Sequence, residues 1–144
     1  MRIREWMRSP VHTVKPHESV AHARALLERF RINQLPVLVD GRLVGIVTDR
    51  DVRDAYPSVV ETGPHAHRRR RRTPVDEIYV EDVMAMNVVT LPPDETIDEA
   101  ARLMRRERIG AVPVVERGRV VGIVTRSDVL DAFVGGTSAQ AVAS

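Results

Sequence analysis

The chain contains no cysteine, few aromatic residues and no apolar run near the roughly 20 residues that a membrane span needs. Without cysteine there are no disulfides, thiolate zinc sites or cysteine nucleophiles, which suits a reducing cytoplasm. Aromatic residues make up only 3% of the 144 residues, so stacking platforms for single-stranded nucleic acid are scarce. The amino terminus carries charges where a signal peptide needs an apolar run. We therefore expect a cytoplasmic protein with no membrane partner.

Recognisable catalytic motifs are also missing. The sequence has no Walker loop, no H-E-x-x-H and no G-x-S-x-G. Its net charge is only +2, and the pI of about 9.6 arises because nearly every cation is arginine. Overall charge alone therefore does not indicate a nucleic-acid partner, and no enzyme is predicted.

The sequence repeats itself at a spacing of 77 residues. Met7 to Tyr56 aligns with Met84 to Phe133 without a gap, and about 23 of the 50 pairs are identical. The strongest block sets Gly41 to Thr48 over Gly118 to Thr125. A single copy of about fifty residues is too small to bury a hydrophobic core by itself. We therefore expect the two copies to pack sheet against sheet about a pseudo-two-fold axis, with clefts between them.

Each copy is predicted to fold as β-α-β-β-α, which makes the chain an α/β (α+β) protein. Val11 to Val14 and Val88 to Leu91 are apolar runs that end at prolines, typical of brief strands. A helix with apolar residues at helical spacing follows in each copy. Thr96 with Glu99 predicts a capping box at the start of the second of these helices.

Two β-rich runs then flank Asp40-Gly41, a strong hairpin signal, and Arg117-Gly118 takes its place in the second copy. A short closing helix is predicted from Asp49 to about Tyr56 and from Arg126 to about Val134. The predicted organisation is a first repeat over 1–56, a linker over 57–83, a second repeat over 84–134 and a flexible tail over 135–144.

The linker contains five consecutive arginines, Arg68 to Arg72, beside His65 and His67. Such a charge run is usually solvated, although it could grip nucleic acid or another polyanion through counterion release. The two histidines alone supply too few ligands for a metal site.

These features resemble a tandem pair of cystathionine-β-synthase (CBS) domains, a Bateman module. The resemblance rests on the LPV and VPV tripeptides, on the G-R-x-V-G-I-V-T block and on two T-x-x-D elements, Thr48/Asp51 and Thr125/Asp128. It implies a regulatory module that binds an adenosine-containing ligand, such as AMP, ADP, ATP or S-adenosylmethionine, in clefts between the repeats. It also implies a homodimer.

The resemblance assigns roles to individual residues. Asp51 and Asp128 would accept hydrogen bonds from ribose hydroxyls, and Thr48 and Thr125 would face the phosphate. The remaining candidates are Arg50 and Arg126 beside the phosphate, and residues flanking the adenine, namely Val11, Ile32, Leu35 and Pro36 in the first copy and Val88, Ile109, Val112 and Pro113 in the second.

Two alternatives stay open. A T-x-x-D at a helix start is also an ordinary capping box that needs no ligand. The protein could then be a ligand-free scaffold that presents its arginine-rich linker to an anionic partner such as nucleic acid. If both corners do bind, the extra carboxylate of Asp49 beside the first corner predicts tighter phosphate binding at the second.

Overall fold

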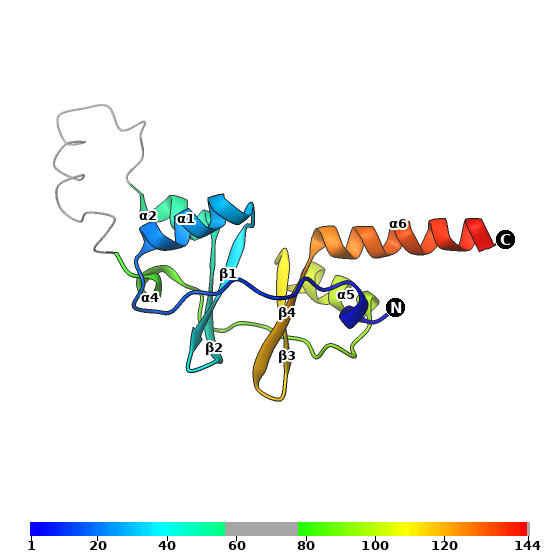
Figure 1. Cartoon of the computed structure of the whole chain (residues 1–144), viewed down its shortest axis with the longest axis horizontal. Coiled ribbons are helices and arrows are strands. Elements are labelled where there is room, and N and C mark those ends of the chain that lie inside the picture. The colour runs from blue at the N-terminus through cyan, green and yellow to red at the C-terminus, as the bar shows by residue number, and fades with distance from the viewer. Residues whose placement is uncertain (57–77, 144) are drawn as a thin grey trace, which may run out of the picture. The chain divides into compact units, whose positions relative to one another are not determined.

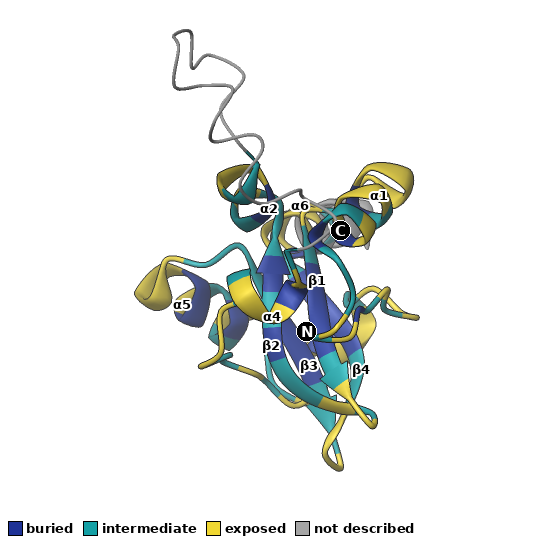
Figure 2. Ribbon diagram, turned by 90° about the vertical axis from the view of Figure 1, so that its left-hand side faces the viewer, coloured by how far each residue is buried: buried dark blue, intermediate teal, exposed yellow. Residues whose placement is uncertain are grey.

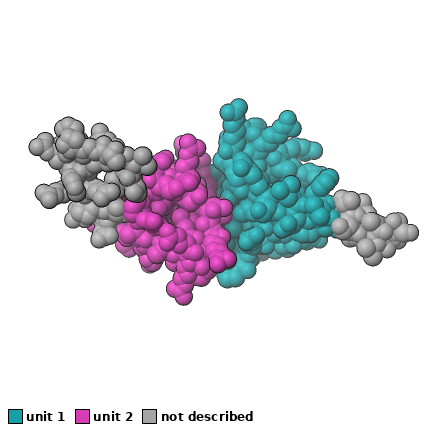
Figure 3. Space-filling model, turned by 90° about the horizontal axis from the view of Figure 1, so that it is seen from above, with its two compact units in different colours: residues 1–11, 89–144 teal, residues 12–88 magenta. Residues whose placement is uncertain are grey.

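The computed structural model describes residues 1–56 and 78–143, which form two compact units (Figures 1 and 3). Unit 2 is His12–Val88, and unit 1 combines Met1–Val11 with Val89–Ser144. The linker histidines and the five consecutive arginines lie outside the described residues. Within the described part of the chain, no helix combines the length and the apolar character needed to cross a membrane.

Both units carry the same helix-strand-strand-helix series and one further helical turn, which confirms the predicted duplication of an α/β half-fold. Unit 2 contains α1 (Val20–Phe30), β1 (Gln34–Val39), β2 (Arg42–Thr48), α2 (Asp49–Ala55) and α4 (Val80–Val83). Unit 1 contains η1 (Ile3–Glu5), α5 (Ile97–Glu107), β3 (Ala111–Glu116), β4 (Arg119–Thr125) and α6 (Arg126–Ala143).

Each unit is built on one antiparallel hairpin, β1 with β2 or β3 with β4. The turn residues Asp40 and Gly41 have φ of 51° and 82°, and Arg117 and Gly118 have φ of 53° and 78°. Positive φ at both central residues is what a type I′ turn requires, and this turn matches the twist of the strands. The predicted hairpins are confirmed.

The predicted first strands shrink to a single bridge in each unit. Val14 pairs in parallel with Val37, and Leu91 pairs in parallel with Val114. Around Val14 the ladder consists of two hydrogen bonds, to Pro36 and from Leu38, of 3.0 and 2.9 Å. Pairing stops there because a proline follows shortly in each copy, and proline has no N–H to donate.

The other edge of each hairpin is paired by a segment that leads into the other unit. In unit 2, Ala85 exchanges two backbone hydrogen bonds of 2.9 Å with Ile46 of β2. In unit 1, Arg8 exchanges two of 2.8 and 3.1 Å with Ile123 of β4. We call residues 1–11 and 78–88 the arms. They occupy equivalent positions 77 residues apart, so the repeat extends further towards the amino terminus than Met7.

The second arm corrects the predicted linker boundary. Composition places residues 78–83 in the linker, but they fold into unit 2, where Val80 of α4 is completely buried. The backbone N–H of Val80 donates to Glu18, and Val20 donates to Ile78, both at 2.8 Å. The pattern was missed because a helix of one turn is too short to show an apolar period.

Each unit has its own hydrophobic core, which lies between its hairpin and its helices (Figure 2). The core of unit 1 contains Ile3, Ile97, Ala100, Leu103, Met104, Val112, Val114, Val124 and Ala132. The core of unit 2 contains Val14, Val20, Ala23, Leu27, Leu35, Val37, Val47, Val52 and Val80. Each core thus includes an arm residue, Ile3 or Val80.

Two helix ends differ from the prediction. Thr96 caps α5 by accepting a hydrogen bond of 3.1 Å from the N–H of Glu99, but the reciprocal bond comes from Glu95, whose carboxylate accepts from Thr96 N–H at 3.0 Å. The Glu99 carboxylate pairs with Arg102 instead. Helix α6 continues to Ala143 through the segment predicted as a tail, because no proline interrupts it and alanine favours the helix.

Candidate functional site

The two T-x-x-D elements lie where a strand turns into a helix, at the β2–α2 and β4–α6 corners. The Asp51 Oδ2 atom accepts hydrogen bonds of 2.9 Å from both the N–H and the hydroxyl of Thr48. The Asp51 N–H donates back to Thr48 Oγ1 at 3.2 Å. Thr125 and Asp128 repeat all three bonds at 2.8, 3.0 and 3.3 Å. Both elements are therefore reciprocal capping boxes, which fix the carboxylate orientation.

The corners differ in what contacts the second carboxylate oxygen. In unit 1 the Arg8 Nε atom lies 3.3 Å from Asp128 Oδ1, and Asp128 is only 4% exposed. Within the described residues, Asp51 Oδ1 has no hydrogen-bond partner. Arg8 is absent from the sequence-based set because it is 120 positions from Asp128. The one available signal was the 77-residue repeat, which aligns Arg8 with Ala85 and so gives only one corner an arginine.

This difference changes what each carboxylate can still accept. An ionised carboxylate has about four acceptor positions. Among the described residues Asp51 uses two of them, both on Oδ2, so that its Oδ1 accepts no hydrogen bond there. Asp128 uses three, and Arg8 adds a positive charge. The first corner therefore suits two hydroxyl donors, whereas the second suits an anion with one donor beside it.

The two arginines predicted beside the phosphate are placed differently. Arg50, the second residue of α2, is exposed. The side chain of Arg126 instead lines a pocket between α5 and α6, which Asp128 does not line. Near the first corner, Asp49 pairs with Arg53 at 3.8 Å on the exposed face of α2. Part of the extra negative charge predicted there is thus already balanced.

The residues predicted to flank the adenine fall into two groups. Leu35, Pro36, Val112 and Pro113 are buried in the strands, the first and third at 0% exposure, whereas Val11, Ile32, Val88 and Ile109 are partly exposed. Val11 belongs to unit 1, whereas its predicted partners Ile32, Leu35 and Pro36 belong to unit 2. Val88 belongs to unit 2, whereas its predicted partners Ile109, Val112 and Pro113 belong to unit 1.

The described residues contain no group of three or more His, Asp or Glu side chains that could hold a metal ion. The histidines near the first repeat have other contacts. His12 stacks on Phe30 with ring centroids 3.7 Å apart, and His22 lies 2.7 Å from the Glu18 carboxylate. Both histidines are exposed, so these contacts lie at the surface.

The fold and the twin corners agree with comparisons to known proteins. The CBS domain family model matches residues 3–58 and 80–135, so the chain belongs to the CBS domain family. It is 30% identical over 126 residues to the CBS domain-containing protein YhcV of Bacillus subtilis, covering 88% of this chain and 81% of YhcV. It is 39% identical over 120 residues to inosine-5'-monophosphate dehydrogenase of Korarchaeum cryptofilum. That match covers 83% of this chain but only 21% of the dehydrogenase.

Solved structures share the tandem arrangement. The CBS domain pair of protein MJ0100, in complex with 5'-methylthioadenosine and S-adenosyl-L-methionine, superposes with a TM-score of 0.76 at 30% identity, covering 94% of this chain and 98% of that one. CBSX2 in complex with AMP also gives a TM-score of 0.76, at 27% identity, with 94% and 98% coverage. These likenesses confirm the predicted tandem CBS-domain pair.

Proposed function

We propose that this protein is a regulatory module that binds an adenosine-containing nucleotide at its T-x-x-D corners and catalyses no reaction. The observation that carries the proposal is the pair of oriented carboxylates, Asp51 and Asp128, each of which accepts two hydrogen bonds from a threonine at the start of a helix while the aspartate N–H donates back to the threonine hydroxyl. The two related structures named above hold AMP, S-adenosyl-L-methionine or 5'-methylthioadenosine, which share an adenosine group. Ribose hydroxyls are donors that such carboxylates accept.

Thermal melting with AMP, ATP and S-adenosylmethionine tests the proposal. A ligand that binds only the native state stabilises it by about 2.7 kcal/mol when its concentration is 100 times its Kd. We expect at least one of the three to raise the midpoint at millimolar concentration. The simultaneous replacements Asp51→Ala and Asp128→Ala should abolish the rise. No rise with any of the three in the unmodified protein would contradict the proposal.

The control must separate ligand binding from helix capping, because replacing either aspartate also removes a cap. Ser19→Ala and Thr96→Ala remove caps from α1 and α5, where Ser19 and Thr96 accept hydrogen bonds from the third helical residue. Each should lower the midpoint without ligand, since a lost cap costs about 0.5–2 kcal/mol. The shift produced by the nucleotide should persist in both. If the nucleotide no longer raised the midpoint in these variants, the effect of replacing the aspartates would reflect lost stability and not lost ligand binding.

The second corner is predicted to favour phosphate because of Arg8. Removing this side chain leaves Asp128 as an unbalanced negative charge beside the bound anion. Arg8 is 60% exposed, so solvent screens the effect, and we expect Arg8→Ala to weaken AMP binding at this corner by about three- to five-fold. The measurement is calorimetric titration of AMP into Arg8→Ala on an Asp51→Ala background, which leaves only this corner.

Arg4→Ala on the same background is the matched control. Arg4 lies on the same arm and is exposed, but it pairs with Asp94 and Glu116 rather than with Asp128. It should leave the affinity unchanged. Stronger AMP binding after Arg8→Ala would show that Arg8 competes with the ribose and would reverse the predicted order of the two corners.

A further inference from the structure

A pocket of about 310 Å³ lies between α5 and the start of α6 in unit 1. Its walls are of two kinds. One part is cationic and consists of Arg105, Arg108 and Arg126, and the other part is apolar and consists mainly of Met104, Val129 and Leu130. The volume is at the lower end of the range for small-molecule sites.

The three pocket arginines have no carboxylate partner within the described residues. The neighbouring arginines of α5 do, since Arg102 lies 3.4 Å from Glu99 and Arg106 lies 3.5 Å from Glu107. The Arg126 guanidinium lies over Gly110, where a Cβ atom would be 3.6 Å from its Cζ. The positive charge of the pocket is thus uncompensated, although carboxylates are close by on the same helix.

The other repeat shows that the fold does not require this charge. At the positions 77 residues earlier, Glu28 replaces Arg105 and Asp49 replaces Arg126. These acids pair with arginines of their own helices, Glu28 with Arg24 at 3.0 Å and Asp49 with Arg53 at 3.8 Å. Unit 2 therefore carries a locally paired acid at two of the three positions, and at the third Arg31 corresponds to Arg108. A feature that one repeat has and its copy lacks points to function rather than folding.

We propose that this pocket binds a phosphate monoester with an apolar group. A planar guanidinium group can donate two parallel hydrogen bonds to two oxygens of one phosphate. The positive charge of three such groups balances a phosphate dianion better than a carboxylate with a single negative charge. The apolar group would cover Met104, Val129 and Leu130, which gains hydrophobic free energy in proportion to the area buried. A free phosphate would leave this surface exposed.

The site is separate from the proposed nucleotide corner. Asp128 is buried and turned toward Thr125, while the neighbouring Arg126 side chain lines the pocket. A ligand in the pocket therefore needs neither aspartate of the corners. The proposal stands or falls independently of the nucleotide proposal.

The test is a calorimetric titration of the full chain with phenyl phosphate, inorganic phosphate, phenol and benzoate, each in a separate experiment. Phenyl phosphate should bind at least about tenfold more tightly than each of the other three, since it alone joins the dianion to the apolar group. The double variant Arg105→Gln/Arg108→Gln should lose about tenfold of this affinity, because charged hydrogen bonds to the ligand are removed. Both residues are exposed, and circular dichroism checks that the variant folds.

The control variant Arg102→Gln/Arg106→Gln loses the same charge from the same helix outside the pocket, and it should change the affinity less than twofold. An equal loss of affinity in the control would overturn the proposal, because binding would then depend on the total positive charge of the helix and not on the pocket. So would equal binding of phenyl phosphate and inorganic phosphate, or loss of binding in Asp51→Ala/Asp128→Ala. The last measurement is the oligomeric state by sedimentation, with and without phenyl phosphate. If phenyl phosphate binds only to a monomer and not to a dimer, the face belongs to a subunit interface and the proposal fails.

Discussion

Replacing Ile3 with alanine is expected to lower the free energy of unfolding of unit 1 by about 2–5 kcal/mol, the usual cost for a large buried aliphatic residue. Ile3 is 0% exposed although it is the third residue of the chain, and it belongs to the same core as Leu103 and Val112. Alanine loses the transfer free energy of the removed carbons and leaves a cavity. The backbone around it relaxes little, because it is held by hydrogen bonds on both sides.

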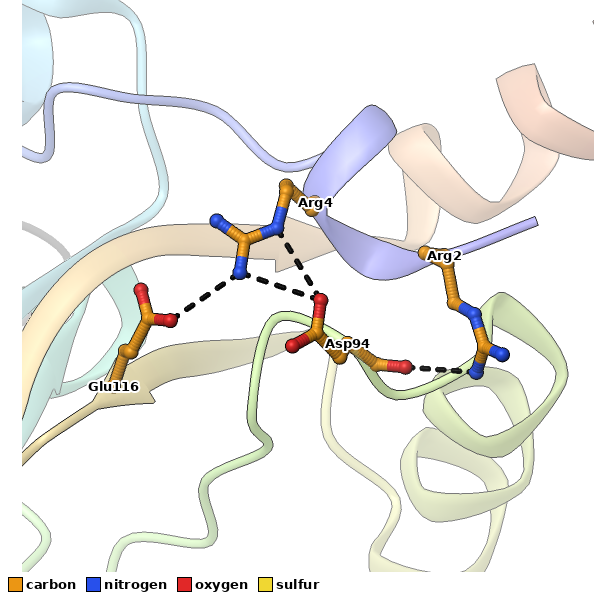
Figure 4. A network of polar contacts seen from close by, with 4 residues as sticks. All are labelled: Arg2, Arg4, Asp94 and Glu116. Atoms are coloured by element: carbon orange, nitrogen blue, oxygen red, sulfur yellow. Dashed lines mark hydrogen bonds and ion pairs between the residues drawn. The ribbon is translucent and has the colours of Figure 1, made fainter.

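Those hydrogen bonds fix the first arm. The N–H of Ile3 donates to Glu95 at 2.8 Å, the N–H of Arg4 donates to Pro93 at 2.9 Å, and Ile97 donates to Met1 at 3.0 Å. The Arg4 side chain reaches between Asp94 and Glu116, 3.3 Å from each (Figure 4). These ion pairs are solvent-exposed and contribute little. Packing of Ile3 therefore dominates the attachment of the arm.

Urea denaturation followed by circular dichroism measures the change. Val134→Ala is the matched control, because it shortens an aliphatic residue of the same unit that is 60% exposed. It should change the stability by less than about 0.5 kcal/mol. If Ile3→Ala were as mild as this control, the first arm would not be part of the core of unit 1.

Gly45→Ala is expected to destabilise unit 2 by about 1–3 kcal/mol, the cost of overpacking a tightly packed site. A Cβ atom on Gly45 would lie 2.6 Å from the Met84 Sδ atom and 2.9 Å from the Ala85 carbonyl oxygen. The sulfur could move, but the carbonyl belongs to the backbone that pairs with Ile46. The substitution therefore pushes the second arm away from β2 and strains its two hydrogen bonds.

Gly110→Ala is the control, because a Cβ atom there would meet its nearest neighbour at an ordinary 3.6 Å. The double variant Gly45→Ala/Met84→Ala should recover only part of the lost stability, since it removes the contact with sulfur but not the contact with Ala85. Full recovery would show that the side chain, and not the backbone of the arm, sets the need for glycine. Chemical denaturation of the unmodified protein, Gly45→Ala, Met84→Ala and the double variant gives the coupling free energy.

Local signals explain why much of the fold is predictable from the sequence. Asp40-Gly41 requires a tight turn, and Thr48 with Asp51 predicts a helix start; both depend on residues within four positions of one another. The same dependence on near neighbours explains why the sequence predicts the wrong acid, Glu99, as the partner of the Thr96 N–H. The sequence places an acid both before and three residues after it, and only the folded geometry selects Glu95 over Glu99.

The arms were beyond local reasoning. Residues 1–6 precede the visible repeat, and residues 78–83 carry charges typical of a linker, yet Ile3 and Val80 are both completely buried. Their partners lie in elements that only tertiary packing brings together. The corner chemistry was therefore predicted in part, since Asp128 was identified and Arg8, which contacts it, was not.

The exchanged arms also bear on how such a protein can arise and be altered. In this chain the arm that precedes each repeat pairs with the hairpin of the other repeat. In a single ancestral copy, the arm would therefore pair with the hairpin of a second chain, as in a domain-swapped dimer. Fusing two such chains head to tail makes this exchange intramolecular and independent of concentration. The fused halves then become inseparable by simple truncation, because cutting the chain at the midpoint leaves each half with the arm that completes the other unit and without the arm that completes its own.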